Sequence, residues 1–306
     1  MKIYHTSLNK GQDVHGIWQW MFGSFYTSVS LDEADLIFVV LFNHPFSLDT
    51  DALELVRNSG KPIVVFDYWE ENWNKNAYGY PFPELEALEV KAYFKREFWK
   101  HTKNNWYAID FYNFKTWDKI DSYEEFNARP IDILMIWGLS NPIRPQVHGN
   151  LMGACHEYGW THISNTAYMK NERSPYAVLL HKPWYDRMSE DEMYELQSKA
   201  KITISLPGSG EKCFRSSEAP LNSVMAMLDY NSRISWQAGW DETNCVFFGD
   251  SVLDHEDNPD YGRDLKWELD RPEALYQKYL NGTKIANNIK PEIIWTNWIL
   301  PRLNGL

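Results

Sequence analysis

Short apolar runs of strand length recur along the chain, separated by polar turns and by helix-length stretches. In the first half, residues 35–42 and 62–67 are almost continuously apolar and rich in Val, Ile and Phe. In the second half, residues 131–137 repeat the pattern, and residues 201–206 form a strand-like stretch that alternates polar and apolar residues and is rich in β-branched ones. Such runs are typical of strands buried on both faces of a parallel sheet. Their alternation with helices predicts an α/β fold.

Helix signals lie between the apolar runs. Asp49 or Thr50 caps a helix predicted over 50–59, and Gly60 ends it. Other predicted elements are a helix at 189–200 with Ser189 and Glu192 in capping-box register, helices at 146–158, 272–280 and 291–303, and strands at 106–111, 234–236 and 244–248. The sequence therefore predicts sheets connected by short helices.

The chain divides into two halves of similar strand and helix content. Residues 118–129 are polar and aromatic, and they read as a crossover between the halves. We expect an N-terminal α/β domain over 1–125 and a C-terminal α/β domain over 126–285. We also expect residues 286–306 to form a helix that packs back on the first domain.

The most informative stretch covers residues 201–219. A β-branched strand is followed by Pro-Gly-Ser-Gly and then by apolar residues at helical spacing over 214–228. A glycine turn that opens a helix presents unpaired N–H groups and the positive end of the helix dipole, which suits a phosphate. Lys212 and Arg215 add cations, and Glu218 adds a carboxylate that can accept hydrogen bonds from a ribose. Two plainer interpretations stay open: glycine turns are common in α/β folds, and Glu218 can simply offset the dipole.

Composition narrows the function classes. The chain has 306 residues, a net charge of −12 and an aromatic content of 16%. The negative charge disfavours non-specific nucleic-acid binding, which depends on phosphate neutralisation. A local basic stripe could still exist, formed by Lys91, Lys95, Arg96, Lys100 and Lys103. The fifteen Trp residues slightly favour a carbohydrate ligand, because sugar rings stack on indoles.

The sequence contains no sign of secretion or membrane insertion. Three widely spaced cysteines form no C-x-x-C pair, which indicates neither a disulfide framework nor a cysteine zinc site. The chain starts without a signal-peptide pattern, and no run approaches the ~20 apolar residues of a membrane span. We therefore expect a cytoplasmic protein without a membrane span.

The motif I-S-L-P-G-S-G-E-K-C-F-R-S-S-E-A resembles the donor-binding segment of exostosin-like GT-B glycosyltransferases, some of which are encoded by bacteriophages and large viruses. The resemblance covers about twenty residues well. It implies two Rossmann-like domains that face each other across a cleft. It departs downstream, where the family has a glycine and a small apolar strand but this chain has Asn-Ser-Val-Met-Ala-Met over 222–227.

The resemblance also implies site residues. The turn residues Gly208, Ser209, Gly210, Lys212 and Arg215 would hold the diphosphate of a nucleotide sugar, with a UDP-sugar as the first expectation. Glu218 would hold the ribose or the donor sugar, and Arg144 would add a second diphosphate contact. Lys182 precedes the 189–200 helix in a basic, aromatic cluster, and either contacts the ligand or belongs to a solvated loop.

Glycosyl transfer with inversion also needs a base for the acceptor hydroxyl. Asp67 is our first candidate because it ends a buried strand, and His15 is a lesser one. The alternatives are that Asp67 caps the next turn, or that the transfer retains configuration and needs no such base. Asp49 and Asp51 form a D-x-D pair, but Asp49 lies at a helix cap, so we expect no metal requirement.

These features predict a glycosyltransferase that acts on a hydroxyl acceptor. The acceptor is a carbohydrate or a hydroxymethylated base in phage DNA. The alternative is a non-catalytic module that binds carbohydrate or nucleotide. An NAD-type dehydrogenase is disfavoured because no G-x-G-x-x-G follows the first strand.

Overall fold

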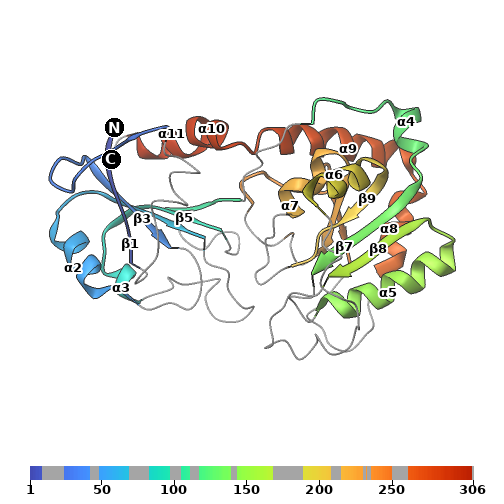
Figure 1. Ribbon diagram of the computed structural model, residues 1–306, viewed down its shortest axis with the longest axis horizontal. Coiled ribbons are helices and arrows are strands. Elements are labelled where there is room, and N and C mark those ends of the chain that lie inside the picture. The colour runs from blue at the N-terminus through green and yellow to red at the C-terminus, as the bar shows by residue number, and fades with distance from the viewer. Residues whose placement is uncertain are drawn as a thin grey trace. The chain divides into compact units, whose positions relative to one another are not determined.

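The chain folds into two compact units (Figure 1). The structure is a computed structural model that describes residues 1–8, 24–41, 48–68, 83–96, 105–110, 117–138, 143–167, 189–207, 215–229, 232, 236–249 and 261–304. The first unit comprises Met1–Phe114, Ile234–Gln237 and Asn288–Leu306. The second comprises Lys115–Arg233 and Ala238–Asn287. Each unit contains its own parallel sheet, so the predicted α/β fold is confirmed.

The first unit is built on a six-stranded parallel sheet of order β2-β1-β3-β4-β5-β6. Its strands are β1 (Lys2–Ser7), β2 (Thr27–Ser28), β3 (Leu36–Leu41), β4 (Ile63–Asp67), β5 (Val90–Lys95) and β6 (Trp106–Ala108). Every residue of β3 and β4 is buried, as the continuous apolar runs predicted. Neighbouring strands pair in parallel from β1 through β3, β4 and β5 to β6. In the pair of β4 with β5 the register shifts between Ile63 and Val64.

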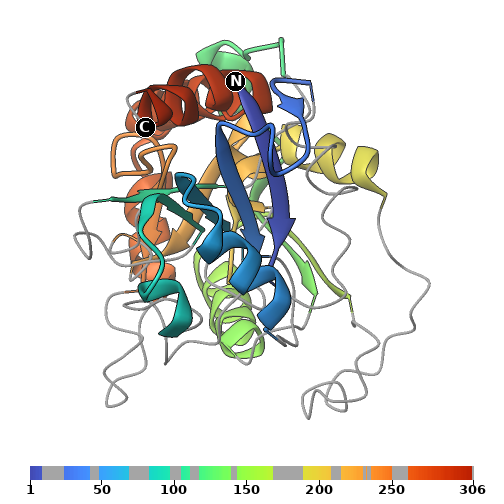
Figure 2. The same cartoon turned by 90° about the vertical axis from the view of Figure 1, so that its left-hand side faces the viewer.

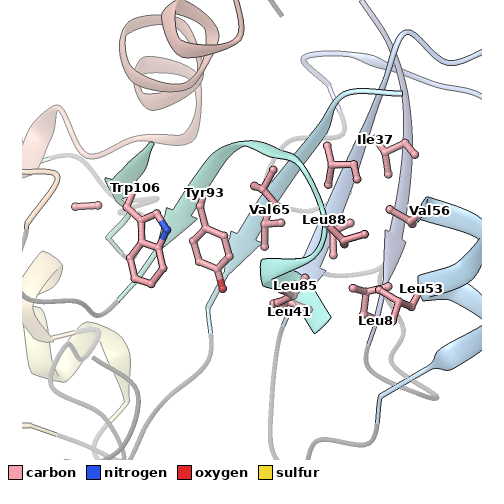
Figure 3. Close-up of a cluster of buried hydrophobic side chains, with 14 residues drawn as sticks. Leu8, Ile37, Leu41, Leu53, Val56, Val65, Leu85, Leu88, Tyr93 and Trp106 are labelled. Carbon is pink, nitrogen blue, oxygen red and sulfur yellow. The ribbon is translucent and has the colours of Figure 1, made fainter. Parts of the chain in front are cut away.

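One face of this sheet packs against helices α2 (Thr50–Asn58) and α3 (Pro83–Glu86). Ile37, Val39 and Leu41 of β3 belong to one apolar cluster with Leu53 and Val56 of α2. Figure 3 shows this cluster, with Ile37 near Val56 and Leu41 near Leu85 of α3. The side chain of Asp49 accepts a hydrogen bond from the amide of Ala52 at 3.0 Å, which confirms the predicted cap. The cluster packs strands β4 and β5, which end in the polar residues Asp67 and Lys95, against the helices.

The other face carries a row of aromatic rings and the C-terminal segment. Phe38, Phe66 and Phe94 come from adjacent strands, and their ring centroids lie 5.0 and 4.8 Å apart along the row. Trp295 packs edge-on against Phe38 at 6.2 Å. The segment consists of α10 (Pro291–Ile294), the π-helical η3 (Trp295–Ile299) and α11 (Leu300–Leu303). It lies in red near the N-terminal strand in Figure 2.

The second unit is built on a five-stranded parallel sheet of order β11-β10-β9-β7-β8. Its strands are β7 (Ile131–Gly138), β8 (His162–Ala167), β9 (Ala200–Ile204), β10 (Val224–Leu228) and β11 (Val246–Phe248). Its helices are α4 (Tyr123–Asn127), α5 (Ile143–Tyr158), α6 (Glu190–Ser198), α8 (Tyr261–Leu269) and α9 (Pro272–Asn287). In α6, Ser189 and Glu192 form both halves of the predicted capping box.

Two sequence predictions for the second unit are corrected. The helix expected over 214–228 is instead the single turn α7 (Arg215–Glu218), the short 3-10 helix η1 (Ala219–Leu221) and strand β10. Pro220 lacks an N–H group, and all five residues of β10 are buried beside β9, so strand pairing takes precedence over the helical spacing. The departure from the glycosyltransferase pattern is corrected only in part, because 224–228 is a small apolar strand after the helical turn but Asn222 and Ser223 stand where the pattern has a glycine.

Other differences lie at the edges of the predicted elements. Helix α8 was not predicted from the sequence. The strand predicted at 234–236 falls mainly outside the described residues, and Trp236 is not in a strand. The predicted strand at 106–111 is confirmed over Trp106–Ala108.

Candidate functional site

The carboxyl edge of the second sheet contains a topological switch point. Strand β7 pairs with β8 on one side and with β9 on the other, and all three strands run parallel. The connections that follow β7 and β9 therefore leave the sheet in opposite directions. In open α/β sheets, ligands bind in the crevice that this divergence creates. The switch point is the first candidate site.

Arg144 joins the two sides of the switch point. It is the second residue of α5, which follows β7, and it is 7% exposed. Its Nε donates to the carbonyl of Pro207 at 2.6 Å, and its Nη2 donates to the carbonyl of Leu206 at 3.0 Å. Both carbonyls belong to the segment directly after β9. The guanidinium thus holds the exit of β9 against the start of α5.

Two serines, one before and one after residues 208–214, contact each other. Ser205 and Ser216 are both buried, and their hydroxyl oxygens lie 3.2 Å apart. Ser205 also donates its amide to the carbonyl of Ala226 at 2.8 Å, which continues the pairing of β9 with β10. The residues before and after 208–214 are therefore fixed to each other and to the sheet.

Arg215 and Glu218 lie on α7, which begins directly after residues 208–214. Arg215 Nη1 and Glu218 Oε2 form an ion pair at 3.2 Å, with side-chain exposures of 21% and 27%. Among the described residues, Glu218 is the only polar side chain that Arg215 contacts. Arg144 thus contacts the residues just before 208–214, and the Arg215–Glu218 pair lies just after them, while their roles in a ligand site stay predictions. The single turn of α7 supplies no extended helix dipole, so the dipole part of that prediction is wrong.

Several predicted site residues lie outside the described part of the chain. They are His15, Lys182, Gly208, Ser209, Gly210 and Lys212. Their roles stay predictions, supported only by their positions in the sequence.

One turn after Arg144, His148 marks a buried polar spot that sequence reasoning did not use. Its Nε2 lies 3.3 Å from the hydroxyl of Ser164, and its ring meets Trp137 edge-on at 5.7 Å. Burial lowers the pKa of His148, and the nearby His162 lowers it further. His148 Nδ1 and Trp137 Nε1 are buried and have no hydrogen-bond partner in the described structure. The neutral imidazole of His148 therefore adds no positive charge to the part of α5 that follows Arg144.

The two described cysteines of the second unit, Cys155 and Cys245, are poor nucleophiles. Burial raises the pKa of Cys155 to about 11, and burial also raises the pKa of Cys245. Both are therefore protonated thiols at neutral pH. Among the described residues, no group of three His, Cys, Asp or Glu side chains could hold a metal ion.

The first unit has a separate polar cluster at the carboxyl edge of its sheet. Asp67 ends β4 and is 1% exposed. Its Oδ2 accepts hydrogen bonds from Tyr93 Oη and from Lys95 Nζ, both at 2.8 Å. Lys95 also lies over the ring of Trp106 at 5.8 Å. Sequence reasoning selected Asp67 but missed this pairing, which links β4 to β5 across the sheet.

The proposed basic stripe is corrected by the same cluster. Lys95 and Arg96 are 2% and 1% exposed, so neither offers its charge to a surface ligand. The reason is that β5 lies between β4 and β6, and that Lys95 pairs with Asp67. Lys91 is exposed and lies near Glu89, while Lys100 and Lys103 fall outside the described residues.

Within the described residues, no helix is both long enough and apolar enough to cross a membrane. No protein-family model matches the chain, and no curated protein matches it.

Solved structures do resemble the chain. One is a protein assigned as a UDP-N-acetylglucosamine 2-epimerase from Listeria monocytogenes, at 12% identity and a TM-score of 0.45, covering 97% of this chain and 81% of that one. Another is the S. aureus MnaA–UDP co-structure, at 12% identity and a TM-score of 0.48, covering 100% and 97%. A third is the spinosyn rhamnosyltransferase SpnG with spinosyn aglycone, at 10% identity and a TM-score of 0.36, covering 93% and 76%. Similarities at this level do not identify an activity for this chain.

Proposed function

We propose that this chain is a glycosyltransferase that transfers a sugar from a nucleoside-diphosphate donor, first of all a UDP-sugar, to a hydroxyl acceptor. The observation that carries the proposal is the placement of Arg215. It follows β9 and the glycine turn that the sequence predicts after this strand, it is partly exposed, and its one polar side-chain partner in the described structure is Glu218. A diphosphate can compete for this guanidinium because charge-assisted, bidentate contacts favour phosphate.

The chemistry requires stabilisation of the departing nucleoside diphosphate. Arg215, together with Lys212 and the backbone amides of the predicted turn, supplies that charge without a metal. Glu218 then accepts hydrogen bonds from a ribose or sugar hydroxyl. Binding would replace the Arg215–Glu218 contact with two contacts to the ligand, one from each side chain.

Asp67 remains our candidate base, with His15 as the lesser one. As a base, Asp67 would exchange a hydrogen bond from Tyr93 or Lys95 for one from the acceptor hydroxyl. The burial of Lys95 and Arg96 removes two members of the basic stripe that a DNA acceptor would use. A carbohydrate acceptor is therefore favoured over a hydroxymethylated base in DNA.

The test is thermal unfolding of the purified chain with UDP, GDP, ADP, dTDP and the matching nucleotide sugars, each with EDTA and with Mg²⁺. A ligand at a hundredfold excess over Kd stabilises the native state by about 2.7 kcal/mol, which gives a clear shift in Tm. We expect UDP to shift Tm equally with EDTA and with Mg²⁺. No shift with any nucleotide would contradict the proposal.

Release of UDP from the donor that binds, measured with and without carbohydrate acceptors, separates an enzyme from a binding module. An enzyme releases UDP faster when its acceptor is present. Tight binding without release under any acceptor would favour the non-catalytic alternative.

A further inference from the structure

We infer that Arg144 is a positioning residue, which shapes the nucleotide site through the backbone after β9 and does not itself bind phosphate. The inference rests on the proposed function, because it concerns the same site. It departs from the direct diphosphate contact that the sequence suggested for Arg144.

The first argument is where the guanidinium is directed. Two of its nitrogens, Nε and Nη2, donate to the consecutive carbonyls of Pro207 and Leu206 at 2.6 and 3.0 Å. With 7% of its surface exposed, Arg144 is also largely removed from solvent. To bind a phosphate in place of these carbonyls, it would have to give up both of these hydrogen bonds to buried backbone acceptors, which is unfavourable.

The second argument is what the contact constrains. Leu206 is 2% exposed and Pro207 is also buried. They are the last described residues before the predicted phosphate turn. On the other side of that turn, Ser216 is tied to Ser205 through their hydroxyls at 3.2 Å. Arg144 and the serine pair thus fix both ends of one segment. A site whose backbone is held in place before binding loses less conformational entropy when it binds.

The third argument is a comparison within the same strand. Arg129 makes similar contacts at the opposite end of β9, donating to the carbonyls of Ala200 and Asn222 at 2.6 and 2.7 Å. Arginine is therefore used twice in this sheet as a connector of carbonyls. Arg129 lies at the amino edge, away from the switch point, so it is the matched control for Arg144.

The test compares Arg144→Lys and Arg144→Met with Arg129→Lys. Kd for UDP is measured by calorimetry at several salt concentrations, and amide hydrogen exchange is measured in the free protein in peptides covering 203–207, in which Pro207 itself has no amide proton. A lysine keeps the charge but cannot donate in a fork to two carbonyls. We expect both Arg144 variants to weaken UDP binding by a similar factor, on the order of tenfold, which corresponds to about 1.4 kcal/mol.

The salt dependence of Kd separates positioning from direct contact. A positioning role leaves the slope of wild type unchanged and speeds exchange at 203–207 in both Arg144 variants. Arg129→Lys should lower the free energy of unfolding while Kd of the folded protein stays the same. The inference is overturned if Arg144→Lys keeps wild-type affinity while Arg144→Met loses affinity with a shallower salt slope, or if neither variant changes Kd.

The two proposals fail in different ways. If wild type binds no nucleotide, the proposed function fails, and exchange at 203–207 in the free protein alone decides whether Arg144 holds this segment. If Arg144→Met does not fold, Arg144→Lys decides, because it retains the stem and the charge. Unchanged exchange in that variant overturns the inference.

Discussion

The arginines near the two ends of strand β9 differ in their exposure and in the groups that they contact. At the amino end, the side chain of Arg129 is 3% exposed and donates twice to Asp121 and twice to backbone carbonyls, and its guanidinium lies 4.7 and 4.8 Å from the ring centroids of Phe126 and Tyr279. At the carboxyl end, Arg144 is also buried and connects carbonyls, but Arg215 just beyond it is partly exposed and pairs with Glu218 alone among the polar side chains of the described structure.

The difference separates stability from binding in one sheet. A buried arginine whose donors are all directed at protein groups stabilises the fold and has nothing to offer a ligand. An arginine that is partly exposed, beside the crevice of a parallel sheet, loses little when it exchanges its carboxylate for a phosphate. Changes at the amino edge should therefore alter the free energy of unfolding, and changes at the carboxyl edge should alter ligand affinity.

The largest effect is expected from Arg129→Ala. The change leaves the buried side of Asp121 and two carbonyls without their donors, so the free energy of unfolding should fall by about 3–5 kcal/mol. Urea unfolding followed by Trp fluorescence measures this loss. Kd for UDP of the folded protein should not change. A loss below about 1 kcal/mol, typical of an exposed pair, would contradict the assignment of the amino edge.

Arg215→Ala should reverse that pattern. Loss of a charge-assisted contact to the diphosphate should weaken UDP binding by about 1.5–3 kcal/mol, or roughly 10- to 150-fold. The free energy of unfolding should change by less than about 1 kcal/mol, because the pair with Glu218 is partly solvated. The matched control is Arg57→Ala, which removes an arginine from another exposed ion pair with a glutamate three residues away, Glu54. Equal affinity of both variants would exclude Arg215 from the site.

Ser189→Ala sharpens the comparison with a smaller change. The substitution removes the capping box of α6, the helix that leads into the amino end of β9. The free energy of unfolding should fall by about 1 kcal/mol. UDP affinity should be that of wild type. Weaker UDP binding in this variant would show that the amino and carboxyl edges are coupled.

The acid dependence of stability gives the finest test of the amino edge. Burial alone would raise the pKa of Asp121, but hydrogen bonds and charges from Lys119 and Arg129 outweigh it and lower the pKa below its ordinary 3.8. The stabilisation is thus present above that value and is lost as pH falls through the lower pKa of the folded protein. In Asp121→Asn, the free energy of unfolding should depend less steeply on pH in this acid range. An unchanged slope would contradict the assigned pairing.

The core strands were predictable from sequence because burial on both faces leaves a continuous apolar signature. β3, β4 and β7 follow such runs, β9 follows from the alternation of β-branched and polar residues, and the caps at Asp49 and Ser189 were equally local signals. The predicted helix over 214–228 failed because apolar spacing in a short segment fits a buried strand as well as a helix. Pairing of 224–228 between β9 and β11 is a long-range contact that no local pattern reveals.

The sequence supplied candidate site residues but not their contacts. Arg215 and Glu218 were selected because charged groups beside a strand–turn–helix suit a phosphate, and Arg144 was selected from the glycosyltransferase resemblance. Their division into a buried connector and a partly exposed pair depends on where α5 meets the exit of β9, some sixty residues apart in sequence. Lys95 was taken for a surface cation for the same reason, because its partner Asp67 lies on the neighbouring strand.

The most direct test of the account is amide hydrogen exchange of the wild-type chain with and without saturating UDP. The account predicts protection in peptides covering 143–147 and 203–218, at the carboxyl edge of the second sheet. It also predicts unchanged exchange at the amino edge, in peptides covering 119–129 and 189–198. Protection at the amino edge, or none at the carboxyl edge while UDP is bound, would contradict the central claim that this switch point is the nucleotide site.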